Sequence, residues 1–399
     1  LAWTYMTIIK KDRVILLYGG LWAANRCEHL LKLLAASGYT IACVFPQYYE
    51  KTRHDRNIVS KLVNKITRNV FSYIELFVKA SFAEVIYILP GNSNLIHDVL
   101  LVSKLFKTKV VLELYDSITT HYLDNKGASS ITEEDLDTVK KDNVDLSLSK
   151  EKKAIESSDR IILTTDYEAV FLSQLLGINI PKEKILSAPL CCSPKGLHQR
   201  DFMQDGVFRL CWWGSFLPLH GLDYILDAAK ILQQSGIAFE CDLFGAYAPG
   251  SIAHFFEKYT QRIKAEGLNT HVRLRRDLTF ADGSLPQYLM HSCDLALGIF
   301  GDNLRAKSAV PNKLIESLSM AIPSLTRSSQ VLQEFFDIKT DLWTCDPDPE
   351  SIAQAVLDIY HHKSYPVDWQ KTRAKVLETF NIKRYQDVVL QSIEMAIES

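Results

Sequence analysis

The sequence predicts an α/β protein with two Rossmann-like halves, each built on a parallel sheet. Three observations support this. Short, continuous apolar runs alternate with amphipathic helical stretches, which is typical of parallel strands buried on both faces. The alternation stops near the middle of the chain and then restarts. The length of 399 residues fits two or three domains. We therefore expect two sheets, each covered by helices.

The first half begins with a predicted strand at 13–18 that ends in Gly19-Gly20. A helical pattern follows from 24 to 37, and Gly38 ends it because glycine favours the end of a helix. Further predicted strands lie at 40–45, 85–89, 110–114 and 161–164. The segment 131–160 is rich in both acidic and basic residues, so a solvated surface is the expectation for it.

The second half repeats the pattern. A predicted strand at 209–213 ends at Gly214, and apolar residues at helical spacing follow at 222–234. The next predicted elements are a strand at 239–244 that ends at Gly245, a strand at 294–300, and helices that begin near Pro311 and at Asp348-Pro349.

A stretch with prolines, a glycine and mixed polar residues separates the halves. We expect a first domain at 1–190, a linker at 191–206 and a second domain at 207–375. The remaining helical stretch, 376–399, is followed by no strand. Its packing partner stays open at this point, and the first domain is one candidate.

Composition excludes several classes of protein. The 45 Lys and Arg residues nearly balance 47 Asp and Glu residues, so overall basicity gives no support for nucleic-acid binding. Eight scattered cysteines without a Cys-x-x-Cys pattern indicate free thiols rather than a disulfide scaffold or a zinc site. The most apolar stretch, 71–89, contains three charged residues, which argues against a membrane-spanning helix. We expect a cytoplasmic protein, either soluble or peripheral on the inner face of a membrane.

The first candidate site is the segment from Trp213 to Gly221, between a strand and a helix. Ligands of parallel sheets bind beyond the carboxyl ends of the strands. A helix that starts at Gly221 directs unpaired N–H groups at this loop, which suits a phosphate, and His220 adds a donor. The alternative is a turn without a ligand. Neither half has a Gly-x-Gly-x-x-Gly or Gly-Lys-Ser/Thr pattern after its first strand, which disfavours dehydrogenases and P-loop proteins.

The second candidate site spans residues 302–316. Arg305, Lys307 and Lys313 supply positive charge for a phosphate, and Glu316 supplies an acceptor for sugar hydroxyls. Lys313 and Glu316 share one helix face because they are three residues apart. The alternative is a surface salt bridge between them.

Two segments resemble a known family. The strand–Gly-x-x-x-Pro-x-x-Gly–helix unit at 209–234 and the run Pro-Asn-Lys-Leu-Ile-Glu-Ser-Leu-Ser-Met-Ala-Ile-Pro at 311–323 are similar to family 4 retaining glycosyltransferases of the GT-B fold (glycosyl transferases group 1). The resemblance implies two Rossmann-like domains that face each other across a cleft. It also implies transfer of a hexose from a nucleotide diphosphate sugar to a hydroxyl group with retained configuration, without a metal or another cofactor.

This sequence matches only some positions of the family pattern. Glu316 matches the family's ribose-binding Glu, whereas Ser308 stands where a second Glu is usual. Ser215 and His220 occupy the positions of the Arg and Lys that clamp the diphosphate. We expect the cations of the second candidate site, assisted by His220, to replace that clamp. The resemblance implies this donor-binding set: Gly19, Gly20, Gly214, Ser215, His220, Gly221, Gly245, Asp277, Leu278, Arg305, Lys307, Lys313 and Glu316.

The first half supplies the acceptor side in this resemblance. Gly19 and Gly20 would approach the donor phosphates, because glycine allows close backbone contact. Asp116 and His121 would act at the sugar, with Lys313 as the third catalytic candidate. Asp116 and His121 are each as well explained as caps of the next helix.

A basic stretch at 51–79 has seven cations and two acidic residues, with apolar residues at helical spacing. It predicts either a helix for an anionic membrane surface or a helix docked on the sheet. The expected acceptor is a glycan or a lipid-linked molecule in cell-surface polysaccharide or glycolipid synthesis. Two other functions stay open: a nucleotide-sugar epimerase, and a degenerate member that binds nucleotide without catalysis.

Overall fold

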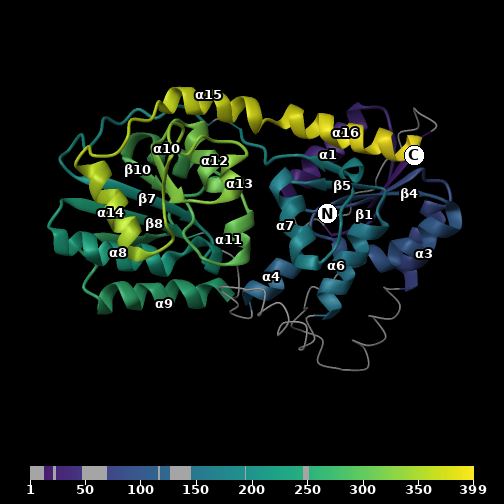
Figure 1. The fold of residues 1–399 in the computed structure, drawn as a ribbon, viewed down its shortest axis with the longest axis horizontal. Helices are drawn as coiled ribbons and strands as arrows, with labels where there is room; N and C mark the ends of the chain where they lie inside the picture. Colours follow the sequence, from purple (N-terminus) through teal and green to yellow (C-terminus); the bar gives the residue numbers. More distant parts are fainter. Residues whose placement is uncertain are drawn as a thin grey trace. The chain divides into compact units, whose positions relative to one another are not determined.

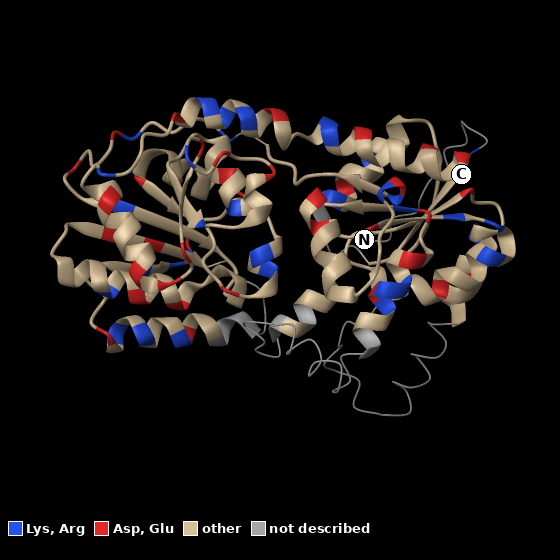
Figure 2. Ribbon diagram, viewed as in Figure 1, with Lys and Arg blue, Asp and Glu red and all other residues tan. Residues whose placement is uncertain are grey.

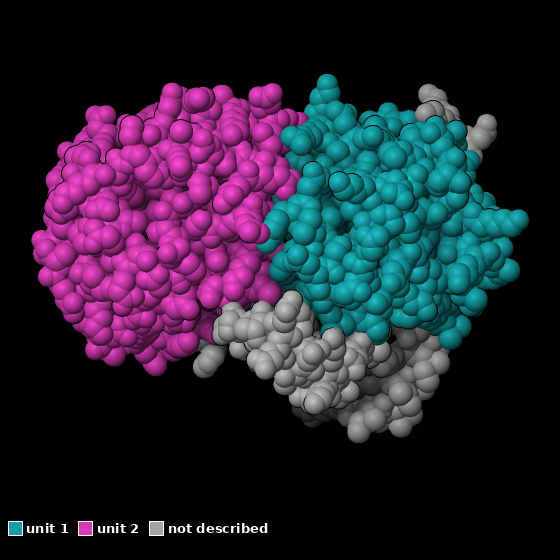
Figure 3. Space-filling model, viewed as in Figure 1, with its two compact units in different colours: residues 1–126, 132–189, 382–399 teal, residues 127–131, 190–381 magenta. Residues whose placement is uncertain are grey.

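The computed structural model describes residues 13–20, 24–46, 70–115, 117–125, 145–193, 195–245 and 251–399. These residues form two compact units, shown in different colours in Figure 3. Unit 1 contains the described residues up to 125, residues 145–189 and residues 382–399. Unit 2 contains the described residues from 190 to 381.

Unit 1 is built on a six-stranded parallel sheet with the order β2-β1-β3-β4-β5-β6 (Figure 1). Its strands are β1 Val14–Tyr18, β2 Thr40–Val44, β3 Val85–Ile88, β4 Lys109–Glu113, β5 Arg160–Leu163 and β6 Ile185–Ser187. Its helices are α1 Ala24–Ala36, 70–80, η1 Ser93–Leu95, α3 Ile96–Phe106, α4 Ile118–Asn125, α6 Asp145–Ser157, α7 Asp166–Leu176, η2 Lys182–Lys184 and α16 Ile382–Glu398.

Helix α16 belongs to unit 1, although about 190 residues of unit 2 come before it in the chain. It packs on β3 to β6 and on α1. Polar contacts support the packing, because Arg13 donates to Glu394 (2.8 Å) and Arg160 donates to the Met395 carbonyl (2.8 Å). The preceding helix α15, Trp369–Thr379, belongs to unit 2.

Unit 2 is built on a second six-stranded parallel sheet with the order β12-β11-β10-β7-β8-β9. Its strands are β7 Phe208–Gly214, β8 Phe239–Gly245, β9 Val272–Arg275, β10 Leu295–Leu297, β11 Ser324–Arg327 and β12 Trp343–Cys345. Its helices are η3 Pro218–His220, α8 Leu222–Ser235, α9 Ser251–Ala265, α10 Ser284–Ser292, α11 Leu304–Ser308, α12 Asn312–Ser319, α13 Gln330–Gln333, α14 Pro349–Tyr360 and α15.

Each sheet changes direction of winding between two neighbouring strands. In unit 2 the chain builds β7, β8 and β9 toward one edge and then returns to β10 on the other side of β7. In unit 1 the same change occurs between β1 and β3. Crevices form beyond the carboxyl ends of strands at such switch points. The loops after β7 and β10, and those after β1 and β3, are therefore the places to look for a ligand site.

The fold class and the strands expected from the long apolar runs are confirmed, with shifts of one to three residues at their ends. Asp348 also caps α14 as predicted, because its side chain accepts from the Ser351 N–H (2.8 Å). The expected solvated surface at 131–160 is present on only one side of α6, where Lys153 and Glu156 are exposed. Helix α6 buries Glu151, Ala154 and Ile155 in unit 1.

Charged residues of both signs are interspersed over both units in the view of Figure 2, which agrees with the near-zero net charge. No helix among the described residues is long and apolar enough to span a membrane. Residues 51–69 of the predicted basic stretch lie outside the described residues, and 70–80 are helical.

Candidate functional site

The turn between β7 and α8 is fixed to the loop after β10. Strand β7 ends at Gly214, the short helix η3 follows, and Gly221 precedes the first residue of α8. The backbone N–H groups of Phe300 and Gly301 donate to the carbonyls of His220 (3.2 Å) and Leu219 (3.1 Å). The turn and the loop therefore form one backbone unit at the switch point of the sheet.

Gly221 is required by this arrangement. Its φ is +64°, and a Cβ atom would lie 2.5 Å from both the Gly301 nitrogen and the Phe300 carbonyl carbon. A side chain would thus push the turn away from the loop after β10. The predicted role of Gly221 as the start of α8 fits its position as the residue before the helix.

We expect Gly221→Ala to lower the free energy of unfolding by about 3 kcal/mol, from left-handed backbone strain plus the steric clash. Gly236 is a matched control, since its φ is +73° and a Cβ atom added there would meet no other atom within 4 Å. Gly236→Ala should cost only about 1 kcal/mol. Urea unfolding of both variants measures the difference, and equal losses would contradict the steric part.

Lys313 lies at the centre of the candidate site. Helix α12 places it beside the end of β7, where its side chain is buried (5% exposed) and its Nζ is 4.0 Å from the centre of the Trp212 ring. A Cβ atom on Gly214 would come within 3.2 Å of Nζ, so glycine leaves the ammonium group its space. The Nζ atom has no hydrogen-bond partner among the described residues.

Two residues near this lysine also have buried nitrogen atoms without partners. The Nδ1 atom of His220 and the Nε1 atom of Trp212 bond to nothing in the described part of the chain. The rings of these two residues are in edge-to-face contact, with centres 5.7 Å apart. The other ring nitrogen of His220 is 3.3 Å from Ser215 Oγ. Buried polar atoms are normally paired, so this cluster of donors indicates a place for an acceptor.

Burial sets the protonation of the cluster. It lowers the pKa of Lys313 well below its usual value, against an opposing effect of the Glu316 charge. Burial, together with the charges of Lys313 and Arg305, also lowers the pKa of His220 to about 2. An anion bound here would favour the charged form of Lys313, because an opposite charge raises the pKa of an ammonium group.

Glu316 lies one turn after Lys313 on α12. Its Oε2 atom accepts a hydrogen bond from Trp213 Nε1 (2.8 Å), which fixes the carboxylate. Burial raises the pKa of Glu316, while the Trp213 hydrogen bond and the Lys313 charge lower it. The alternative of a surface salt bridge between Lys313 and Glu316 is wrong, because Lys313 is buried and its Nζ is unpaired among the described residues.

The other predicted cations differ from Lys313. Lys307 forms an ion pair with Asp302 (3.2 Å), so part of its charge is already compensated. Arg305 lies on the short helix α11, close enough for its charge to lower the pKa of His220. Arg327 at the end of β11 was not predicted. It is buried, and it donates to the Gly301 carbonyl and lies 3.6 Å from Asp302.

Three predicted donor-binding residues lie at or just after the carboxyl ends of β8 and β9. Gly245 lies against the Phe216 ring, which a Cβ atom would strike. Asp277 is exposed and is paired with Arg275 (2.7 Å). Leu278 is half-buried against the apolar cluster on one face of the sheet. The contact with Phe216 thus explains why residue 245 is a glycine, and Asp277 is paired with the neighbouring Arg275.

In unit 1, a buried asparagine that the sequence analysis missed holds Gly19-Gly20. Asn92 accepts from the Gly20 N–H (2.8 Å) and donates to the Gly20 carbonyl (2.9 Å). Gly19 has a φ of +140°, and its Cβ position would be 2.8 Å from Asn92 Cγ. The turn sequence Pro90-Gly91-Asn92 after a buried strand was the available signal.

The two catalytic candidates of unit 1 stay predictions. Asp116 lies outside the described residues, and His121 lies in α4 with its side chain outside them. The start of α4 is instead capped by Glu151, which accepts from the N–H groups of Ile118 (3.0 Å) and Thr119 (3.1 Å). Glu151 therefore fixes the backbone beside both candidates.

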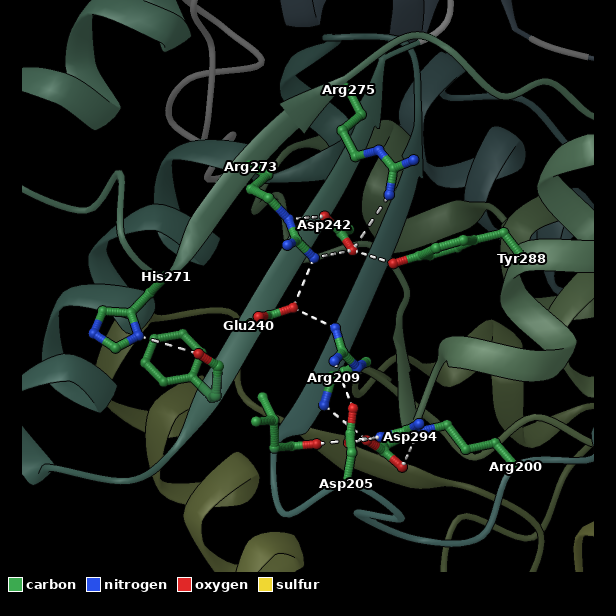
Figure 4. Close-up of polar contacts among 12 residues, drawn as sticks. Arg200, Asp205, Arg209, Glu240, Asp242, His271, Arg273, Arg275, Tyr288 and Asp294 are labelled. Carbon is green, nitrogen blue, oxygen red and sulfur yellow. Dashed lines mark hydrogen bonds and ion pairs between the residues drawn. The ribbon is translucent and has the colours of Figure 1, made fainter.

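A second polar cluster runs across β7, β8 and β9, from Arg209 near the start of β7 to Arg275 at the end of β9 (Figure 4). An open pocket of about 580 Å³ there has four arginines in its wall. Each arginine already contacts a carboxylate, and Tyr288 donates to Asp242. The ion pairs join Arg200 to Asp205 and Asp294, Arg209 to Asp205 and Glu240, Arg273 to Glu240 and Asp242, and Arg275 to Asp242 and Asp277. This cluster ties neighbouring strands together.

Within the described ranges, no group of three or more His, Cys, Asp or Glu side chains is placed to hold a metal ion.

Comparison with solved structures gives extensive similarity at low identity. Sucrose-phosphate synthase from Thermosynechococcus elongatus is 14% identical, with 95% of this chain and 98% of that chain covered and a TM-score of 0.67. HepE from Anabaena, solved in complex with UDP-glucose, is 13% identical, with 95% and 98% covered and a TM-score of 0.62. A UDP-forming α,α-trehalose-phosphate synthase from Burkholderia xenovorans is 10% identical, with 96% and 99% covered and a TM-score of 0.61.

No family model and no curated protein sequence matches the chain. Identities of 14% or less show the fold alone. Both sheets, their parallel strand order and the near-complete coverage agree with that fold. The chain therefore has the GT-B fold of glycosyltransferases, as the resemblance at 209–234 and 311–323 predicted.

Proposed function

We propose that the chain is a retaining glycosyltransferase that binds a nucleotide diphosphate sugar in unit 2. The observation that carries the proposal is Lys313, a buried lysine without a hydrogen-bond partner among the described residues, next to the unpaired Nδ1 of His220. A diphosphate provides the negative charge that this pair of donors lacks. The GT-B fold and the UDP-glucose complex of the similar Anabaena protein support this ligand class.

The residues around the end of β7 and on α12 have separate roles in this proposal. Lys313 and the first turn of α8 hold the diphosphate, with His220 as a neutral donor. Glu316 accepts hydrogen bonds from the ribose hydroxyls, and the backbone at 276–278 contacts the base. The bond between the sugar carbon and the diphosphate oxygen breaks on the face that the acceptor attacks. The acceptor hydroxyl forms the new bond and gives its proton to the departing diphosphate.

The proposed acceptor is a hydroxyl of a glycan or of a lipid-linked molecule. A degenerate member that only binds nucleotide is the second candidate. The observation that favours it is the neutral His220 at a position where the family has a lysine. Incubation with nucleotide diphosphate sugars separates the two, because transfer or slow hydrolysis of a donor supports the enzyme and binding without either supports the degenerate member.

The binding site is tested by titration of nucleoside diphosphates against Lys313→Ala and Glu316→Ala. We expect affinity to fall at least about tenfold in each variant, because each removes a charged partner of the ligand. The matched controls are Lys230→Ala on α8 and Glu257→Ala on α9, where both side chains are exposed. Unchanged affinity in both Lys313→Ala and Glu316→Ala would contradict the assignment of these two residues to the nucleotide site.

A further inference from the structure

Helix 70–80 of unit 1 presents an unusual apolar surface. Large apolar side chains at six of its eleven positions are exposed, and Phe71 is 71% exposed. At 100° per residue these six side chains cover one arc of the helix, about 160° wide. Phe82, just after the helix, is also exposed. Most of this arc is therefore exposed apolar surface on unit 1.

The helix is nevertheless firmly attached to unit 1. Outside this arc, Leu76 and Ala80 are buried in the core of the unit. Phe77 contacts Phe106 of α3 edge to face, with ring centres 4.9 Å apart. Tyr73 donates a hydrogen bond to Asp98 of α3. The exposed arc is therefore held in place by packing on the side that faces the unit.

Helix α3 extends this surface with both apolar and positive side chains. Leu101 is 76% exposed and Leu105 is 60% exposed. Lys104 and Lys107 are exposed at the end of the same helix, and neither forms an ion pair with a described carboxylate. In sequence, residues 51–69 add six cations and one acidic residue directly before helix 70–80. The surface thus combines exposed aromatic and aliphatic side chains with unpaired positive charge.

We propose that helix 70–80 and α3 form a docking surface for an anionic lipid bilayer. Aromatic and aliphatic side chains on a fixed helix insert into the boundary between headgroups and acyl chains, and lysines attract anionic headgroups. A second copy of this chain is a poorer occupant, because the cations of the two copies would repel each other. The inference is independent of the nucleotide-sugar site, since vesicle binding requires neither donor nor transfer.

The test is sedimentation of the full chain with phosphatidylcholine vesicles that contain about a third phosphatidylglycerol, at low and high salt. We expect binding that weakens at high salt and without phosphatidylglycerol. Phe71→Ser/Leu101→Ser should weaken binding by roughly tenfold or more, and Lys104→Gln/Lys107→Gln by roughly tenfold. Val170→Ser is the matched control, because Val170 is 54% exposed on α7 of the same unit.

The altered side chains are exposed, so thermal unfolding should match that of the unaltered chain and confirm that each variant folds. Absence of binding to every vesicle would overturn the proposal. So would equal binding of the unaltered chain and Phe71→Ser/Leu101→Ser. Concentration-dependent dimerisation that this double variant abolishes, without vesicle binding, would assign the surface to a second copy instead.

Discussion

Lys313→Met is expected to stabilise the ligand-free protein by about 1–4 kcal/mol, while it removes nucleoside diphosphate binding. A buried ammonium group without an acceptor destabilises the folded state, and methionine fills a similar volume without charge. Urea unfolding without ligand measures the gain, and titration calorimetry measures the loss of binding. A stability gain together with a binding loss is the signature of a residue kept for its ligand.

The gain should depend on pH in a defined direction. The folded-state pKa of Lys313 is lowered by burial, whereas the unfolded chain has a pKa of about 10.4. Between these values the unfolded state binds more protons, so the unaltered protein gains stability as pH rises. The advantage of Lys313→Met should therefore shrink as pH approaches 10. Lys230→Met on the exposed side of α8 is the control, and an equal gain there would contradict this explanation.

Glu113→Ala is expected to destabilise unit 1 by about 3–5 kcal/mol. Glu113 at the end of β4 is fully buried and forms an ion pair with the buried Arg26. It also accepts from the hydroxyls of Tyr87 (2.5 Å) and Tyr385 (3.3 Å), and Tyr385 lies on α16. Removal of the carboxylate leaves a buried guanidinium uncompensated. Urea unfolding followed by circular dichroism measures the loss.

A matched control lies on the same helix as Arg26. Glu28 of α1 is exposed and pairs with Lys32 (2.6 Å) one turn away. Exposed pairs of this kind contribute little, so Glu28→Ala should leave the unfolding midpoint unchanged. The double variant Arg26→Met/Glu113→Leu should recover most of the stability, because it removes both buried charges at once. A double variant as unstable as Glu113→Ala would show that the charge pair is not the cause.

Strands that are buried on both faces could be predicted from the sequence. Strands β1 and β3 are continuous apolar runs, Val-Ile-Leu-Leu-Tyr and Val-Ile-Tyr-Ile, and their predicted ends lie within one residue of the observed ones. Strands β9 and β11 were missed because they carry arginines, Val-Arg-Leu-Arg and Ser-Leu-Thr-Arg. Arg327 tolerates burial in β11 only because a carbonyl and a carboxylate surround it, which no local pattern reveals.

The site was predictable in outline for a similar reason. Ligands of parallel sheets bind beyond the strand ends, and this rule places Gly214, His220 and Lys313 in one predicted site. The burial of Lys313 and its contact with the Trp212 ring depend on how α12 packs beside β7, which the sequence does not encode locally. Helical spacing alone favoured a surface salt bridge between Lys313 and Glu316 as readily as a donor and an acceptor for one ligand.

The position of α16 has a consequence for synthesis of the chain. The described residues of unit 2 all lie between 190 and 381, whereas unit 1 also needs residues 382–399. On the ribosome, the final helix of unit 1 follows the rest of that unit by roughly 190 residues, or about 10–40 s at 5–20 residues per second. During that interval Tyr385 cannot contact Glu113, and the surface of β3 to β6 that α16 covers stays open. Unit 2 can thus finish folding first. Until α16 is made, unit 1 exposes a surface that chaperones can bind.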